Sequence, residues 1–166
     1  TDKLSLKSYK MFTHNELVLI AAKWVKKSLK FPIVTTELKT TGSREIPDVL
    51  AFRSNTSLII ECKTSLIDFK RDFKKPERIN QDKGVGNYRL YLAPEGLIPI
   101  NLIPKSWGFL EVSSRGTINT VLFKQGNIYH NNSSPELYKI EDPFFHLSDI
   151  DKERSFLYSL LTRKNQ

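Results

Sequence analysis

The chain has 166 residues, which is enough for one domain whose folding buries about 70% of the surface that the unfolded chain exposes. Hydrophobic residues make up 39% and charged residues 27%, and this usage excludes a disordered or collagen-like chain. The net charge of +8 at pH 7 predicts a surface that attracts phosphate polymers or anionic membranes. A membrane span is not expected, because the longest strictly apolar stretch, LVLIAA at 17–22, falls far short of the roughly 20 residues that a spanning helix needs. The single cysteine, Cys62, excludes an internal disulfide and favours a reducing cytoplasm.

The first third of the chain predicts one helix and three strands. Thr13 and Glu16 have the spacing of a capping box, the stretch LVLIAAKWVKKSL that follows has a helical apolar period, and Pro32 ends the helix. The β-branched stretch IVTTEL at 33–38 predicts a strand. Two further strands are expected at DVLAF (48–52) and SLIIECK (57–63), which flank the turn-forming RSNT.

The remainder of the chain alternates between helix and strand. A charged helix is predicted from about Leu66, with Phe69 and Phe73 on one face, until Pro76. Strands are expected at 88–93 and 108–112, then a strand pair at 119–123 and 127–130, and a last helix near 149–163. This order predicts a single α/β domain over residues 1–166, a mixed sheet flanked by helices with a C-terminal strand pair and helix.

Charged residues stand at the ends of the two strands that flank RSNT. If these strands form a hairpin, Phe52 faces Ser57, Leu50 faces Ile59, and Asp48 faces Glu61. Like charges opposite one another destabilise a sheet. Lys63, two residues beyond Glu61, points to the same face. The stretch SLII is apolar on both faces, which is typical of a central strand, and such strands seldom end in charges without a purpose.

A divalent cation between Asp48 and Glu61 would remove their repulsion. Two carboxylates with open positions beside them suit Mg²⁺ or Mn²⁺, and the backbone carbonyl of Cys62 is a further candidate ligand. Such a metal lowers the pKa of a bound water and polarises a phosphodiester, while Lys63 orients the water or steadies the charge on the phosphate. The alternative is that Asp48 lies in a turn after Pro47 and that Glu61 and Lys63 are incidental charges at an exposed strand edge.

This arrangement resembles the signature of the PD-(D/E)XK nuclease superfamily. Pro47 and Asp48 are followed, after twelve residues, by Glu61, Cys62 and Lys63, with a helix and strand before them and a helix after them. The resemblance implies a restriction-endonuclease-like fold in which Asp48 and Glu61 bind the metal and Lys63 assists catalysis.

Some members of the superfamily also use a glutamate of the first helix. Glu16 is the matching candidate ligand here, and Glu45 is a weaker one. The alternative for Glu16 is that it only closes the capping box with Thr13. The histidines His14, His130 and His146 lack the spacing of a zinc or HNH site, and each is interpreted as structural or exposed.

The stretch ECKTSLIDFKRDFKK, with YLAPEGLI later, is also similar to the branch that includes MmcB-like DNA-repair proteins and phage or restriction-associated nucleases. The residues that match its order are Ser65, Asp68, Phe69, Asp72 and Lys75. The similarity covers about residues 13–112, which leaves residues 113–166 as a C-terminal extension. It implies a role in DNA repair, restriction and defence, or phage DNA processing.

Basic residues follow the motif, on the side of the helix away from Phe69 and Phe73. Lys70, Arg71, Lys74, Lys75 and Arg78 form this stripe, which could hold a phosphate backbone. The alternative is a solvated face neutralised by neighbouring acidic residues. A second group, Lys26, Lys27 and Lys30, is interpreted as such a solvated face.

The sequence therefore predicts a divalent-metal-dependent endonuclease that acts on DNA. The alternatives are a catalytically silent DNA-binding module with a nuclease fold, which the positive charge alone would support, and an RNA-processing nuclease. A homodimer or a larger repair or defence complex is the assembly that such a role implies.

Overall fold

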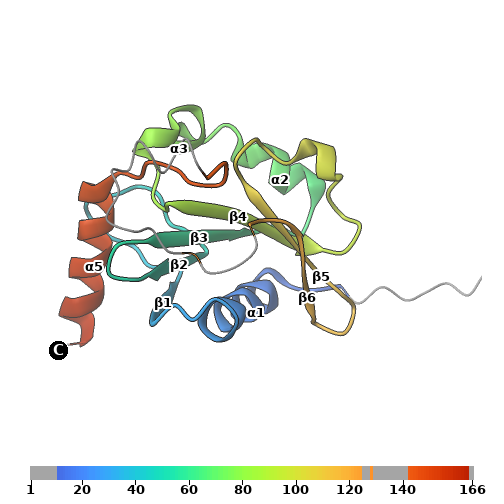
Figure 1. The fold of residues 1–166 in the computed structure, drawn as a ribbon, viewed down its shortest axis with the longest axis horizontal. Helices are drawn as coiled ribbons and strands as arrows, with labels where there is room; N and C mark the ends of the chain where they lie inside the picture. The colour runs from blue at the N-terminus through green and yellow to red at the C-terminus, as the bar shows by residue number, and fades with distance from the viewer. Residues whose placement is uncertain (1–10, 125–127, 129–141, 165–166) are drawn as a thin grey trace, which may run out of the picture.

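A computed structural model describes residues 11–124, 128 and 142–164 of the chain, and a six-stranded sheet is its central element (Figure 1). The strands are β1 (Ile33–Thr36), β2 (Val49–Phe52), β3 (Ser57–Cys62), β4 (Tyr88–Pro94), β5 (Gly108–Val112) and β6 (Ile118–Leu122), and they lie across the sheet in chain order. The pairs β3–β4 and β4–β5 are parallel, and the other three pairs are antiparallel. The predicted mixed α/β class is thus confirmed.

The longer helices begin where the sequence signals predict, but the first two end at Lys27 and Asp72, several residues before Pro32 and Pro76. Helix α1 (His14–Lys27) begins with the capping box of Thr13 and Glu16. Helix α2 (Leu66–Asp72) begins at Ser65, whose hydroxyl accepts a hydrogen bond from the Asp68 backbone. The stretch after Lys75 contains the short α3 (Pro76–Ile79) and the 3₁₀ helix η1 (Gln81–Lys83). A second 3₁₀ helix, η2 (Ile100–Leu102), precedes β5, and the last helix is α5 (Ile150–Lys164).

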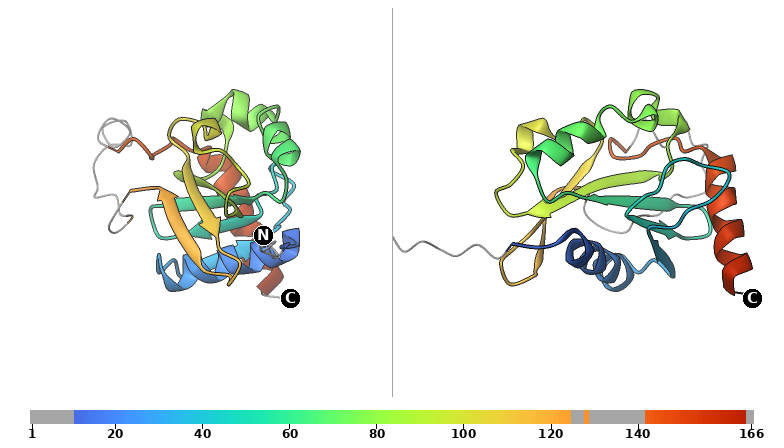
Figure 2. Two further views of the ribbon diagram at one scale, coloured as in Figure 1. Left: turned by 90° about the vertical axis from the view of Figure 1, so that its right-hand side faces the viewer. Right: turned by 180° about the vertical axis from the view of Figure 1, so that it is seen from behind.

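Helices cover the sheet on both faces. Figure 1 shows α1 below the sheet and α2 and α3 above it, and the turned views of Figure 2 show the same layers with α5 across one end. All six residues of β3 are buried, as expected for a central strand, and β3 lies between β2 and β4.

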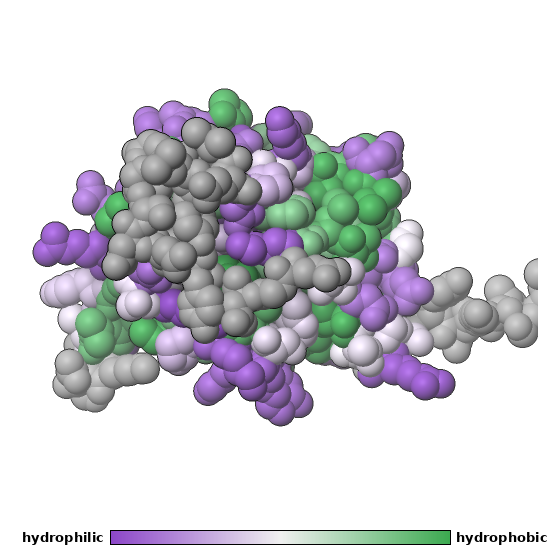
Figure 3. Space-filling model, viewed as in Figure 1, coloured by the Kyte–Doolittle hydropathy of each residue, from purple (hydrophilic) through white to green (hydrophobic). Residues whose placement is uncertain are grey.

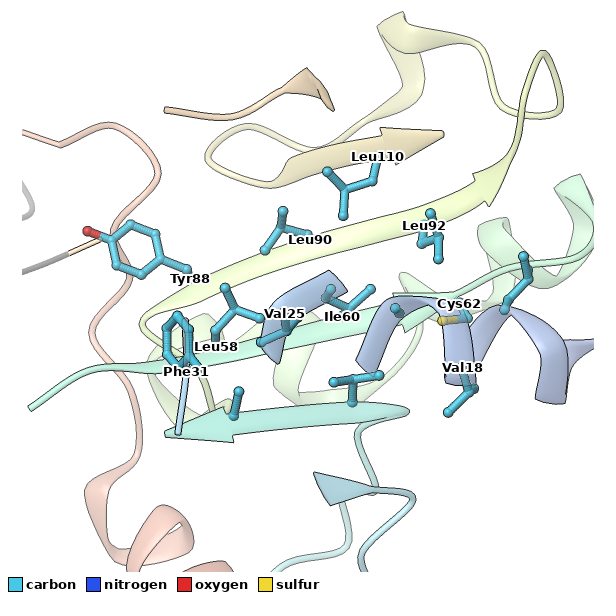
Figure 4. Packing of buried hydrophobic residues seen from close by; sticks show 14 of the residues in the cluster. Val18, Val25, Phe31, Leu58, Ile60, Cys62, Tyr88, Leu90, Leu92 and Leu110 are labelled. Atoms are coloured by element: carbon cyan, nitrogen blue, oxygen red, sulfur yellow. The ribbon is translucent and has the colours of Figure 1, made fainter. Parts of the chain in front are cut away.

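The strands contribute alternate side chains to two apolar clusters. One cluster packs between α1 and the sheet and includes Val18, Val25, Leu58, Ile60 and Leu90 (Figure 4). The other lies on the opposite face and includes Ile59, Phe69, Tyr91, Trp107 and Phe156, which come from β3, α2, β4, the residue before β5, and α5. Because Glu61 has the same parity as Ile59, it belongs to this second face.

The surface is mostly polar on the face that Figure 3 shows. Hydrophilic side chains cover much of it, and hydrophobic ones gather near η2 and β5, where Ile100 is exposed (Figure 3). Among the helices that the structure describes, none combines the length and the apolar character that crossing a membrane requires. The second strand of the predicted C-terminal pair, at 127–130, falls almost entirely outside the described residues.

Candidate functional site

The hairpin of β2 and β3 has the register that the sequence predicts. Phe52 pairs with Ser57 and Leu50 with Ile59. Asp48 directly precedes β2, and its Oδ2 accepts a hydrogen bond of 2.8 Å from the backbone N–H of Cys62, at the end of β3. The carboxylate of Asp48 thus lies at the end of the strand that carries Glu61, as the motif requires. The role of the Cys62 backbone carbonyl as a ligand stays a prediction.

Glu61 is buried and has a built-in counter-ion. Its side chain is 3% exposed, and its Oε1 lies 3.0 Å from the guanidinium of Arg78. Burial raises the pKa of Glu61, and the charge of Asp48 raises it further, while Lys75 and Arg78 oppose the shift. The repulsion between Asp48 and Glu61 that the strand register predicts therefore contributes to the electrostatics of the folded protein.

Asp72 on α2 forms ion pairs with the basic side chains of the site. Its Oδ1 lies 3.2 Å from Lys63 Nζ and 2.7 Å from Lys75 Nζ, and its Oδ2 accepts hydrogen bonds from Arg78 Nε and the Tyr91 hydroxyl. Burial alone would raise the pKa of Asp72, but Arg78, Lys75, Tyr91 and Lys63 outweigh it and hold this pKa well below its usual range. The lysine of the motif is thus fixed by a carboxylate from the following helix.

Arg78 is buried and does not belong to the basic stripe in which the sequence predicts it. It is 9% exposed, it binds Glu45, Glu61 and Asp72 through three different nitrogens, and its guanidinium lies 4.7 Å from the ring centroid of Trp107. The assignment of Arg78 to phosphate binding is therefore corrected: the chain buries this cation because three carboxylates and an aromatic face surround it.

The remaining members of the stripe occupy two environments. Lys70, Arg71 and Lys74 are exposed on α2 and the turn after it, as a phosphate contact requires. Lys75 is partly buried and paired with Asp72. An open cleft of about 760 Å³ adjoins this pair, and its lining includes Glu45, Lys75, Arg44 and Lys152. The sequence pattern did not single out Arg44 or Lys152, because these two residues lie more than a hundred positions apart along the chain.

On its outer side, Asp48 meets residues that the sequence pattern did not assign to the site. The Nε2 atom of His14 lies 3.3 Å from Asp48 Oδ1 and 3.3 Å from Glu37 Oε1. Glu37 follows β1 directly and has a positive φ of 48°, which ends the strand two residues before the predicted boundary.

Glu16 has the structural role that the sequence left as its alternative. Its carboxylate accepts from the backbone N–H and the hydroxyl of Thr13 at the start of α1. His14 is the α1 residue that contacts Asp48, and a role of Glu16 as a metal ligand stays a prediction. The capping signal was readable in the sequence. The place of His14 was not, because it depends on how the start of α1 packs against the sheet edge.

Comparison with known proteins supports the fold alone. Neither a protein-family model nor a curated protein matches the sequence. Among solved structures, a protein of unknown function from Silicibacter pomeroyi is similar to this chain with a TM-score of 0.54 and 16% sequence identity. The similarity covers 92% of this chain and 89% of that protein. The mixed α/β architecture is therefore shared with another protein over nearly its whole length.

Proposed function

We propose that this chain is a divalent-metal-dependent endonuclease that hydrolyses phosphodiester bonds in DNA. The observation that carries the proposal is the placement of Asp48, Glu61 and Lys63 at the matching ends of β2 and β3, in the register expected for paired carboxylates. Asp72 holds the lysine, and the exposed Lys70, Arg71 and Lys74 lie close by in the chain. A basic surface beside a carboxylate pair is what hydrolysis of a polyanion requires.

The residues of the site fit a divalent cation. Burial and, after it, the charge of Asp48 raise the pKa of Glu61, so a cation near both carboxylates would relieve an unfavourable interaction. Asp48 and Glu61 would hold Mg²⁺ or Mn²⁺, with the Cys62 backbone carbonyl as a further oxygen ligand. The bound metal would lower the pKa of a coordinated water and stabilise the leaving oxygen.

Lys63 contributes a positive charge whose position is fixed. It is 5% exposed, and its ammonium donates to Asp72 at 3.2 Å. A cation held by a neighbouring helix would steady the charge that develops on the phosphate without a cost for reorganisation during the reaction. Asp72 is in this reading a positioning residue for Lys63.

Cleavage of single-stranded, double-stranded and branched DNA tests the proposal, with Mg²⁺ or Mn²⁺ at low salt. We expect cutting by the wild type and losses of about 100-fold or more in Asp48→Asn, Glu61→Gln and Lys63→Met. Asn15→Ala, at an exposed position of α1, is the matched control and should cut normally. Metal-dependent cutting that persists in Glu61→Gln would contradict the assignment of Glu61 as a metal ligand of the nuclease. A matched RNA substrate tests the RNA-processing alternative, because RNA alone offers the 2′-hydroxyl.

A catalytically silent DNA-binding module is the second candidate. It is favoured by one observation: Glu61 is already paired with Arg78, and Lys63 with Asp72, so both motif residues have partners within the protein. Salt-sensitive DNA binding by a wild type that cuts none of these substrates with either metal would select this candidate.

A further inference from the structure

Three side chains with metal-binding atoms meet on the side of Asp48 where His14 lies. They come from separate parts of the chain: His14 is the first residue of α1, Glu37 follows β1, and Asp48 precedes β2. One nitrogen and two carboxylate oxygens lie within 4.8 Å of one another. Their meeting therefore results from the tertiary fold, because the three residues are far apart in sequence.

The spacing of these atoms suits a single ion. Adjacent ligands in an octahedral shell with bonds of about 2.1 Å are about 3 Å apart. The imidazole nitrogen of His14 lies 3.3 Å from an oxygen of Glu37 and 3.3 Å from an oxygen of Asp48. The side chains of His14, Glu37 and Asp48 are 40%, 50% and 14% exposed, so an ion could enter from solvent and keep water ligands.

The charges favour this side of Asp48 over the side of Glu61. Arg78 already lies 3.0 Å from Glu61, so a metal ion held by Asp48 and Glu61 must share the Glu61 carboxylate with a permanent positive charge. In the described part of the chain, the ion pairs of Glu37 and Asp48 are with His14. Two carboxylates therefore converge on one imidazole nitrogen at this position.

We infer that His14, Glu37 and Asp48 form a binding site for a divalent transition-metal ion, which shares Asp48 with the position that the nuclease motif implies. The nitrogen ligand gives the site its selectivity, because imidazole suits transition metals whereas Mg²⁺ prefers oxygen ligands and keeps its waters. The site therefore binds Mn²⁺ more tightly than Mg²⁺. The inference deepens the proposed nuclease function, on which its catalytic meaning rests, but binding is measured without DNA.

Titration with Mn²⁺, followed by the electron paramagnetic resonance signal of the free ion, tests the site. We expect His14→Ala and Glu37→Gln to weaken Mn²⁺ binding by about tenfold or more, and Asn15→Ala to leave it unchanged. The preference for Mn²⁺ over Mg²⁺ should decrease in His14→Ala, since this variant lacks the nitrogen ligand. Thermal unfolding of each variant without metal checks that the fold is retained.

A spectroscopic signature separates this site from the position at Glu61. Bound Mn²⁺ should show electron spin-echo modulation from an imidazole ¹⁴N nucleus, which persists in Glu61→Gln and disappears in His14→Ala. Mn²⁺ bound without this modulation, or bound equally well by His14→Ala, would overturn the inference and leave an ion pair only. Mn²⁺ bound with the modulation to a protein that cuts no DNA would retain the site and reject the nuclease. Cutting that needs Glu61 but neither His14 nor Glu37, by a protein whose bound Mn²⁺ shows no imidazole modulation, would retain the nuclease and reject the site.

Discussion

At the scale of single residues, Asp72 determines the electrostatics of the candidate site. Its side chain is fully buried and binds Lys63, Lys75 and Arg78, and two of these basic groups are themselves almost completely buried. Each buried cation needs a partner, because desolvation of an unpaired charge costs several kcal/mol, on the order of the whole stability of a domain. One carboxylate therefore holds together β3, α2 and the start of α3.

Removal of the charge of Asp72 should destabilise the protein in a pH-dependent way. The folded state holds the pKa of Asp72 below its unfolded value of about 3.9, so its stabilisation is complete above that pH and is lost as the pH falls through the folded pKa. We expect Asp72→Asn to lose about 3 kcal/mol at neutral pH and less at acid pH, as measured by urea unfolding. Asp68→Asn on the same helix is the control. An equal loss at both pH values would contradict the prediction.

Glu37 combines a candidate ligand with an unfavourable backbone conformation. Glu37 has a φ of 48°, in the left-handed region of the backbone. This conformation costs a residue with a side chain about 1 kcal/mol or more in free energy, whereas glycine adopts it without this cost. We expect Glu37→Gly to be more stable than Glu37→Ala by about 1 kcal/mol in urea unfolding without metal. At Thr36, which is extended in β1, glycine should instead be less stable than alanine. If the glycine variant is less stable than the alanine variant at both positions, the backbone of Glu37 is unstrained.

At the scale of elements, the sequence predicts most of what the structure contains. The apolar patterns locate six strands and three longer helices, and the turn RSNT sets the register of β2 and β3. The pairings of Arg78 and His14 were not predictable. Arg78 appears in the sequence as one more member of a basic stripe, and its burial depends on Glu45, Glu61 and Asp72 arriving from other elements. Local sequence patterns carry no information on such contacts between residues that are far apart along the chain.

Helix α5, which lies in the predicted C-terminal extension, packs against the core of the sheet. Phe156 is fully buried in the core cluster that also contains Phe69 and Ile59, and Thr40 from the β1–β2 connection donates a hydrogen bond to the Ser155 carbonyl. We expect Phe156→Ala to cost about 3 to 5 kcal/mol in unfolding free energy, whereas Tyr158→Ala, 69% exposed on the same helix, should cost about 0.5 kcal/mol or less. A small loss in Phe156→Ala would mean that α5 packs independently of the sheet.

At the scale of the whole molecule, the positive charge is distributed over both faces of the sheet. Lys70, Arg71 and Lys74 are exposed near α2, on the face of the candidate site, and Lys26 and Lys27 are exposed on α1, on the opposite face (Figure 2). Net charge alone therefore does not locate a nucleic-acid surface. The salt dependence of binding does, because only the lysines and arginines that contact phosphates release counterions.

The affinity for double-stranded DNA should fall with salt less steeply once the α2 surface is neutralised. For each phosphate that the protein no longer neutralises, the slope of log K against log salt concentration should become shallower by about 0.9. We expect this change for the combined Lys70→Gln, Arg71→Gln and Lys74→Gln variant. The matched variant Lys26→Gln, Lys27→Gln and Lys30→Gln removes the same charge from the α1 side and should keep the wild-type slope. Since long-range attraction falls equally in both variants, an equal change in slope would mean that DNA senses only net charge and does not lie on α2.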